Sequence, residues 1–134
     1  MKRLVISLAA FFVATVMAQG QSFCVNLGGD IPQEAASVLH QRFTQMLEGG
    51  KFTVSEEAAD TVKVVANVVE HMSTPGSMSQ SVLVLDIKAS CGEVEETFNV
   101  KGVGKDDQDA WLRACKQILP RSRAAQEFID KLKQ

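Results

Sequence analysis

Cysteine side chains offer the clearest covalent chemistry in this 134-residue chain, which contains Cys24, Cys91 and Cys115. A reactive thiolate needs a lowered pKa, which a Cys-x-x-Cys partner or a nearby imidazolium provides. The sequence has no Cys-x-x-Cys pair, and neither of its two histidines is placed beside a cysteine. A nucleophilic thiol is therefore not predicted, and a disulfide is the simpler chemistry.

Alternation of side chains along a predicted strand indicates which cysteines face the core. Cys91 continues an inward series over residues 83–89, and Cys115 lies on the apolar face of a predicted helix. We therefore predict a Cys91–Cys115 disulfide, which would stabilise the fold by roughly 3 kcal/mol in the chain-entropy model. A pairing that involves Cys24 and a chain with three free thiols are the alternatives.

Soft metal ligands flank a Pro-Gly loop near the middle of the chain. His71, Met72 and Met78 bracket Pro75-Gly76, and such side chains would suit the copper site of an exported carrier. An exposed loop without a metal is the simpler interpretation, and no metal ligand is assigned.

Two groups of carboxylates have the residue types that acid–base catalysis uses. Asp106, Asp107 and Asp109 stand at an expected helix start, where the helix dipole accounts for them. Glu56-Glu57 precede a strand and indicate a solvated turn. The chain also has no phosphate-binding glycine loop with its lysine. We therefore predict no catalytic residue, no bound cofactor and no enzymatic activity.

The hydrophobic pattern predicts the elements that would position these side chains, in the order β-α-β-β-β-β-α-α. Strands are expected over residues 23–27, 51–54, 61–71, 81–89 and 94–103, and helices over residues 30–48, 106–119 and 125–132. Strands joined by short turns should pair antiparallel, and the amphipathic helices need one apolar face of the sheet to cover. The fold class expected is therefore α+β. We predict a two-layer sandwich with a mostly antiparallel sheet of four to five strands and helices on one face.

The opposite face of that sheet is expected to carry apolar side chains among polar ones. These apolar residues are Val65, Val69, Val82 and Val84. Simple alternation places His71 on the same face. Valine is common on any half-exposed sheet, so strand propensity alone is one interpretation. The other is a docking surface for a partner protein or a second copy of the chain.

Residues 1–18 have the pattern of a secretory signal peptide: Lys2 and Arg3 precede an apolar run over residues 4–16, and small residues follow. The run is shorter than the roughly 20 residues of a membrane span. We predict that this leader is cleaved and that residues 19–134 form a single domain without a membrane span. The compartment would then be the periplasm or the extracellular space, and an uncleaved anchor is the alternative.

Charge and composition restrict the partners. The chain carries 14 basic and 16 acidic residues, for a formal net charge of −2, and loss of a basic leader makes the remainder more acidic. Binding to nucleic acid is driven largely by neutralisation of phosphates, so a nucleic-acid partner is not predicted. The same charge argues against adhesion to an anionic membrane surface.

A succession of short motifs resembles that of bacterial envelope domains. Gly50 to Val54 precede Ala59-Asp60-Thr61-Val62, a hairpin has Gly92-Glu93 at its tip, and Gly102-Val103-Gly104 precede an alanine-rich helix. This order is similar to the amino-terminal domain of TolB, the penicillin-binding-protein activator lipoproteins and the curli secretion lipoprotein. The resemblance implies a non-catalytic domain that binds partners or assembles in the envelope. The lipid-attachment box of several of those proteins is missing before Cys24.

Together these features predict an exported, non-enzymatic envelope domain that acts through protein–protein contacts, either with another envelope protein or by self-association. The alternative is a periplasmic carrier of a small ligand or metal. Such a carrier would use the sheet face or the loop between His71 and Met78.

Overall fold

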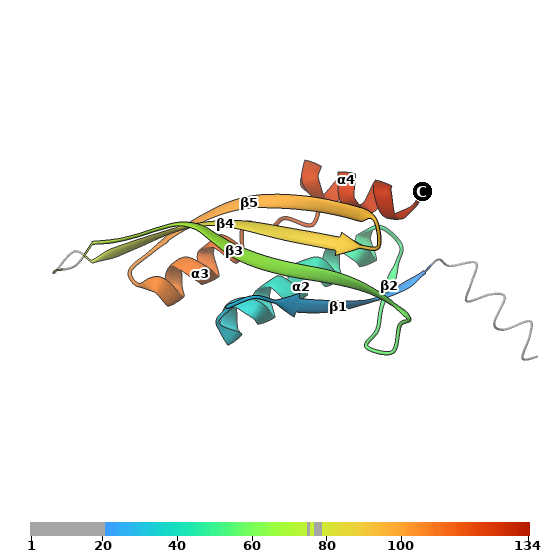
Figure 1. Cartoon of the computed structure of the whole chain (residues 1–134), viewed down its shortest axis with the longest axis horizontal. Helices are drawn as coiled ribbons and strands as arrows, with labels where there is room; N and C mark the ends of the chain where they lie inside the picture. The colour runs from blue at the N-terminus through green and yellow to red at the C-terminus, as the bar shows by residue number, and fades with distance from the viewer. Residues whose placement is uncertain (1–20, 75, 77–78) are drawn as a thin grey trace, which may run out of the picture.

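Helices and strands follow the predicted order (Figure 1). The computed structural model describes residues 21–74, 76 and 79–134. Its strands are β1 (Ser22–Gly28), β2 (Thr53–Val54), β3 (Asp60–Thr74), β4 (Gln80–Cys91) and β5 (Val94–Gly104), and its helices are α2 (Gln33–Gly49), α3 (Asp107–Cys115) and α4 (Arg123–Leu132). The leader predicted over residues 1–18 lies outside the described residues. No described helix has both the length and the apolar character needed to cross a lipid bilayer.

The strands form one mixed sheet in the order β2-β1-β3-β4-β5. β3 pairs antiparallel with β4, and β4 pairs antiparallel with β5, as predicted for consecutive hairpin strands. β1, however, is parallel to both of its neighbours, β2 and β3, so the prediction of a mostly antiparallel sheet is wrong. The physical reason is α2, which returns the chain to the end of the sheet at which β1 began.

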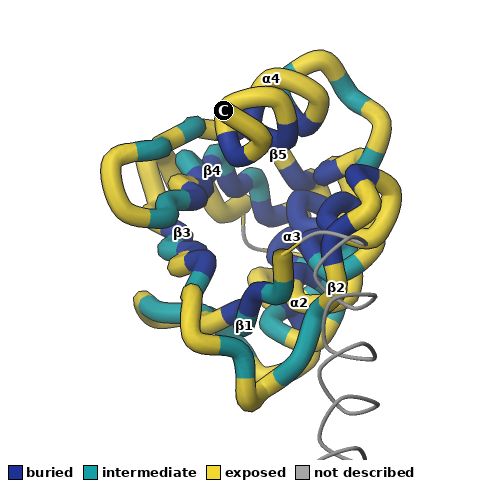
Figure 2. The backbone as a smooth tube through the Cα atoms, turned by 90° about the vertical axis from the view of Figure 1, so that its right-hand side faces the viewer, coloured by how far each residue is buried: buried dark blue, intermediate teal, exposed yellow. Residues whose placement is uncertain are grey.

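The helices of the described residues cover one face of this sheet, as predicted. Alternate side chains of the central strands are buried against them, among them Val62, Leu85 and Ile87. Phe43 of α2 and Phe128 of α4 are fully buried in the same core. Figure 2 shows the buried stretches of strands and helices turned toward one another. The α+β fold class is therefore confirmed.

Helix α3 lies unusually close to β5 because the strand has glycines beneath it. A Cβ atom on Gly102 would lie 2.6 Å from the backbone nitrogen of Ala114, and one on Gly104 would lie 2.6 Å from that of Ala110. Asp106 is the N-cap of the helix, and its side chain accepts a hydrogen bond from the Asp109 N–H at 2.8 Å. This cap satisfies one of the free N–H groups of the first turn.

Candidate functional site

A β-bulge in β3 determines which side chains reach the outer face, the face that the described helices leave open. The register of β3 on β4 shifts between Val68 and Glu70. Beyond the shift, His71 stands opposite the buried Leu83, and Met72 stands opposite Val82. One extra residue reverses the alternation. The prediction that His71 lies on the outer face is therefore wrong.

Apolar side chains gather on the outer face beyond the bulge, and we call them the outer-face cluster: Met72, Val82, Val84 and Val103. Met72, Val82 and Val103 form one row across three strands, because Val82 pairs with Met72 on one side and Val103 on the other. Met72 is 57% exposed and Val103 is 37% exposed. In Figure 1, β3 and β4 form a long arm at the end of the sheet near α3. Met72 and Val82 lie near the base of this arm, because their neighbours His71 and Ser81 contact Asp107, the first residue of α3.

The structure brings together only part of the predicted valine stripe. Val82 and Val84 belong to the outer-face cluster, and Val69 is the extra residue of the bulge, 58% exposed. Val65 is separated from them by a polar row, in which the Asn99 side chain donates a hydrogen bond to Asp86. Sequence reasoning also missed Met72 and Val103. Their positions on the outer face depend on the bulge and on the β4–β5 register. No residue type in the sequence predicts the bulge or the register.

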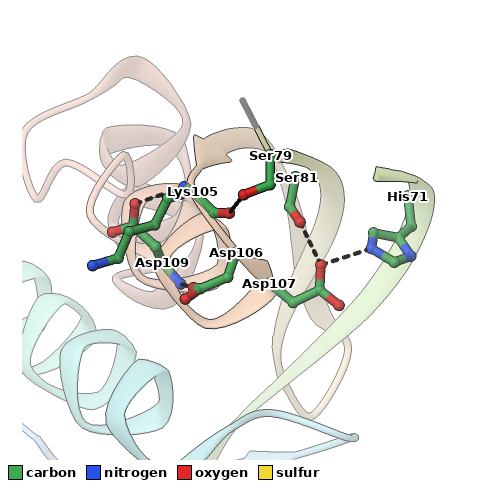
Figure 3. Close-up of polar contacts among 7 residues, drawn as sticks. All are labelled: His71, Ser79, Ser81, Lys105, Asp106, Asp107 and Asp109. Atoms are coloured by element: carbon green, nitrogen blue, oxygen red, sulfur yellow. Dashed lines mark hydrogen bonds and ion pairs between the residues drawn. The ribbon is translucent and has the colours of Figure 1, made fainter. Parts of the chain in front are cut away.

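A polar contact attaches the long β3–β4 arm to the start of α3 (Figure 3). The Asp107 carboxylate accepts a hydrogen bond from the Ser81 hydroxyl at 2.7 Å, and it lies 2.9 Å from Nε2 of His71. The carboxylate is the shared acceptor, so this is not the arrangement in which a histidine activates a serine. Its effect is to position the arm. The hydrogen bond from Ser81, then that from His71, lowers the pKa of Asp107 below its ordinary value of 3.8.

The contact between Asp107, Ser81 and His71 should make the stability of the fold depend on pH. A carboxyl group whose pKa falls on folding contributes stability above its unfolded value, and the contribution is lost as the pH falls through the folded value. Asp107→Asn should therefore be less stable than the wild type at neutral pH. The difference should shrink as the pH falls below 3.8. Thermal unfolding of both proteins across this range measures it, and a constant difference would contradict the assignment.

The loop residues considered for a soft metal do not converge. His71 faces the helix side and Met72 faces the outer side, because they are neighbours in an extended strand. Met78 lies outside the described residues. Within the described ranges, no group of three or more His, Cys, Asp or Glu side chains is placed to hold a metal ion.

The three cysteines are free thiols in the structure. Cys91 lies opposite Val94 at the β4–β5 turn. The chain leaving α3 after Cys115 lies near the other end of β5, where Gln117 accepts a hydrogen bond from the Lys101 N–H at 3.3 Å. That separation is roughly 20 Å along a strand, whereas disulfide-bonded Cα atoms lie within about 7 Å. The register thus gives the Cys91–Cys115 pairing no support, and it stays a prediction.

Thiol reactivity tests this placement. Burial raises the pKa of Cys115 to about 11, so its thiol should stay protonated and shielded at mildly alkaline pH. We expect iodoacetamide to label the half-buried Cys24 in the folded protein and to leave Cys115 unmodified until the chain is denatured. Peptide mapping by mass spectrometry reads both sites. A Cys91–Cys115 bridge in unreduced protein would contradict the structure.

Comparisons with known proteins leave the family open. No protein-family model matches the sequence, and no curated protein matches it. A minor lipoprotein from Acinetobacter baumannii is similar in structure with a TM-score of 0.48 and 10% identity, over 84% of this chain and 91% of that one. A hypothetical protein from Chlamydia trachomatis has a TM-score of 0.36 and 10% identity, over 86% of this chain and 94% of that one.

Proposed function

We propose that this chain is an exported, non-enzymatic envelope domain that binds another protein through the outer-face cluster. One observation supports the proposal above all. Met72, Val82 and Val103 form an apolar row across three strands, on a face that no described helix covers. Exposed apolar side chains that are contiguous, rather than scattered, are typical of interaction sites.

The surroundings of the row also suit a protein interface. Val84, in the next row, stands between Glu70 and Lys101, so charged side chains border the apolar residues. Interfaces commonly have an apolar centre and a polar rim. Burying the exposed part of Met72 would contribute about 1 kcal/mol, since a full burial is worth roughly 1.5–3 kcal/mol. A few such side chains support a specific contact of modest strength.

We propose export because residues 1–18 have the pattern of a signal peptide. Export would place the partner in the periplasm or the extracellular space. Met72 lies on the outer face, opposite Val82, so a partner can reach the outer-face cluster without displacing the described helices. The Asp107 contact with His71 and Ser81 holds the β3–β4 arm in place. These features support a docking role for the outer-face cluster.

Crosslinking in intact cells, followed by mass spectrometry, tests the proposal. The wild-type domain should capture one reproducible partner. Val84→Lys should fold, because Val84 is only partly buried, and the charge that it places on the outer face should abolish capture. Sedimentation of the purified domain then distinguishes a second copy from a different protein. Equal capture by the folded Val84→Lys protein would overturn the proposal.

A further inference from the structure

Strand β1 has one edge that is mostly unpaired. On one side β3 pairs with it from Phe23 to Gly28. On the other side β2 pairs only with Ser22 and Phe23 before the chain turns away at residues 55–58. In the described part of the chain, no strand lies beside the rest of β1 on that side. The edge is therefore open along the second half of the strand.

Hydrogen bonds to β2 show which backbone groups face the open edge. The C=O of Gln21 accepts from the Thr53 N–H at 3.0 Å, and the C=O of Phe23 accepts from the Ser55 N–H at 2.9 Å. The N–H and C=O of one residue point to the same edge, and successive residues alternate. Val25 and Leu27 therefore direct two N–H and two C=O groups to the open edge. The N–H and C=O groups of Cys24 and Asn26 point to β3 instead.

At Val25, the open edge borders a groove of about 530 Å³ between β1 and α2. Its walls include His40 and Thr44 of α2, and Val54 and Glu56 close one end, where β2 stops. The side-chain oxygen of Thr44 is shielded from solvent and has no hydrogen-bond partner among the described residues. The groove lies where β2 would continue if the chain stayed extended.

We propose that this groove binds an extended segment of a partner polypeptide, which joins the sheet as a strand beside β1. Alternating N–H and C=O groups along a free edge are complementary to the backbone of an extended peptide. The outer edge of the sheet gives the contrast. On β5, Lys131 donates a hydrogen bond to the Glu95 C=O at 3.2 Å, and Gln117 accepts from the Lys101 N–H. Side chains thus form hydrogen bonds with backbone groups at the free edge of β5, and proteins commonly protect edge strands in such ways.

Amide hydrogen exchange followed by NMR tests the proposal directly. In the free protein, the amides of Val25 and Leu27 should exchange much faster than those of Cys24 and Asn26, which bond to β3. The probe is an acetylated and amidated Lys-Thr-Val-Thr-Val-Thr-Lys peptide. Saturating peptide should slow exchange at Val25 and Leu27 at least tenfold. No added protection at these two amides would overturn the proposal.

Variants and modified peptides separate strand addition from other binding. Leu27→Pro removes one edge N–H and should weaken peptide binding at least tenfold. Leu27→Ala, which keeps the N–H and loses the side chain, should bind nearly as well as the wild type. Two methylated peptides are compared, one with N-methyl groups on its Thr residues and one with N-methyl groups on its Val residues. Only one of these sets directs its N–H groups toward β1, and strand direction determines which. Methylation of that set should abolish binding, and methylation of the other set should be tolerated. Equal binding of both methylated peptides would contradict pairing at an edge.

The experiment also distinguishes this inference from the docking function. The folded Val84→Lys variant changes the outer-face cluster and leaves the β1 edge intact. It should therefore bind the peptide with wild-type affinity while losing its partner at the outer face. Parallel loss of peptide binding in Val84→Lys would show that the groove is not an independent site.

Discussion

Replacement of Gly102 by alanine is expected to lower the free energy of unfolding by roughly 3 kcal/mol, the upper part of the range for overpacking a core. A methyl group at this position would lie 2.6 Å from the backbone nitrogen of Ala114 and 2.9 Å from its Cβ. It would also meet the carbonyl oxygen of Ala110. These are mostly backbone atoms of α3, so the helix must move as a whole.

Gly49→Ala is the matched control for that substitution. Gly49 is the last residue of α2, and no heavy atom outside the helix backbone lies within 4 Å of a Cβ added there. Alanine should be neutral or stabilise by about 0.5 kcal/mol, because it reduces the entropy of the unfolded chain. Urea unfolding monitored by circular dichroism measures both variants. Wild-type stability of Gly102→Ala would contradict the close packing of α3 on β5.

Met72→Asp is expected to weaken binding of the captured partner by roughly 30-fold. Central interface residues contribute roughly 2 kcal/mol or more, and each 1.4 kcal/mol corresponds to a factor of ten in affinity. The substitution removes an apolar side chain and places a carboxylate beside Val82, where binding would desolvate it. Folding should be preserved, because Met72 is 57% exposed.

Leu119→Asp controls for the loss of an exposed apolar side chain elsewhere. Leu119 is 53% exposed and lies in the connection between α3 and α4, away from the sheet's outer face. Its substitution should change affinity less than threefold. Isothermal titration calorimetry with the purified partner compares the two variants. Equal losses would mean that binding does not depend on the outer-face cluster.

Periodic patterns in the sequence were sufficient to predict much of the fold. Leu83, Leu85 and Ile87 alternate with partly or fully exposed residues, and they lie on the helix-covered face as expected. Phe43 recurs at helical spacing with the other buried residues of α2. These predictions succeed because a buried face imposes a period of 2 on strands and 3.6 on helices.

Features that depend on strand pairing could not be predicted in the same way. The parallel placement of β1 follows from how α2 crosses the sheet, and alternation within β1 is the same in either direction. The bulge near Val69 adds one residue without any distinctive residue type, yet it exchanges the faces of His71 and Met72. The open edge of β1 exists because β2 pairs through only two residues. Each is a property of register rather than of local composition.

Site-specific photocrosslinking in living cells tests the docking function most directly. A photoreactive amino acid replaces Met72 in one strain and Leu119 in another, so that each probe samples its own surroundings within a few ångströms. The docking account predicts a discrete crosslinked product from position 72, containing either one other protein or a second copy of the chain, and none from position 119. Absence of a product at position 72, or the same product from both positions, would contradict it.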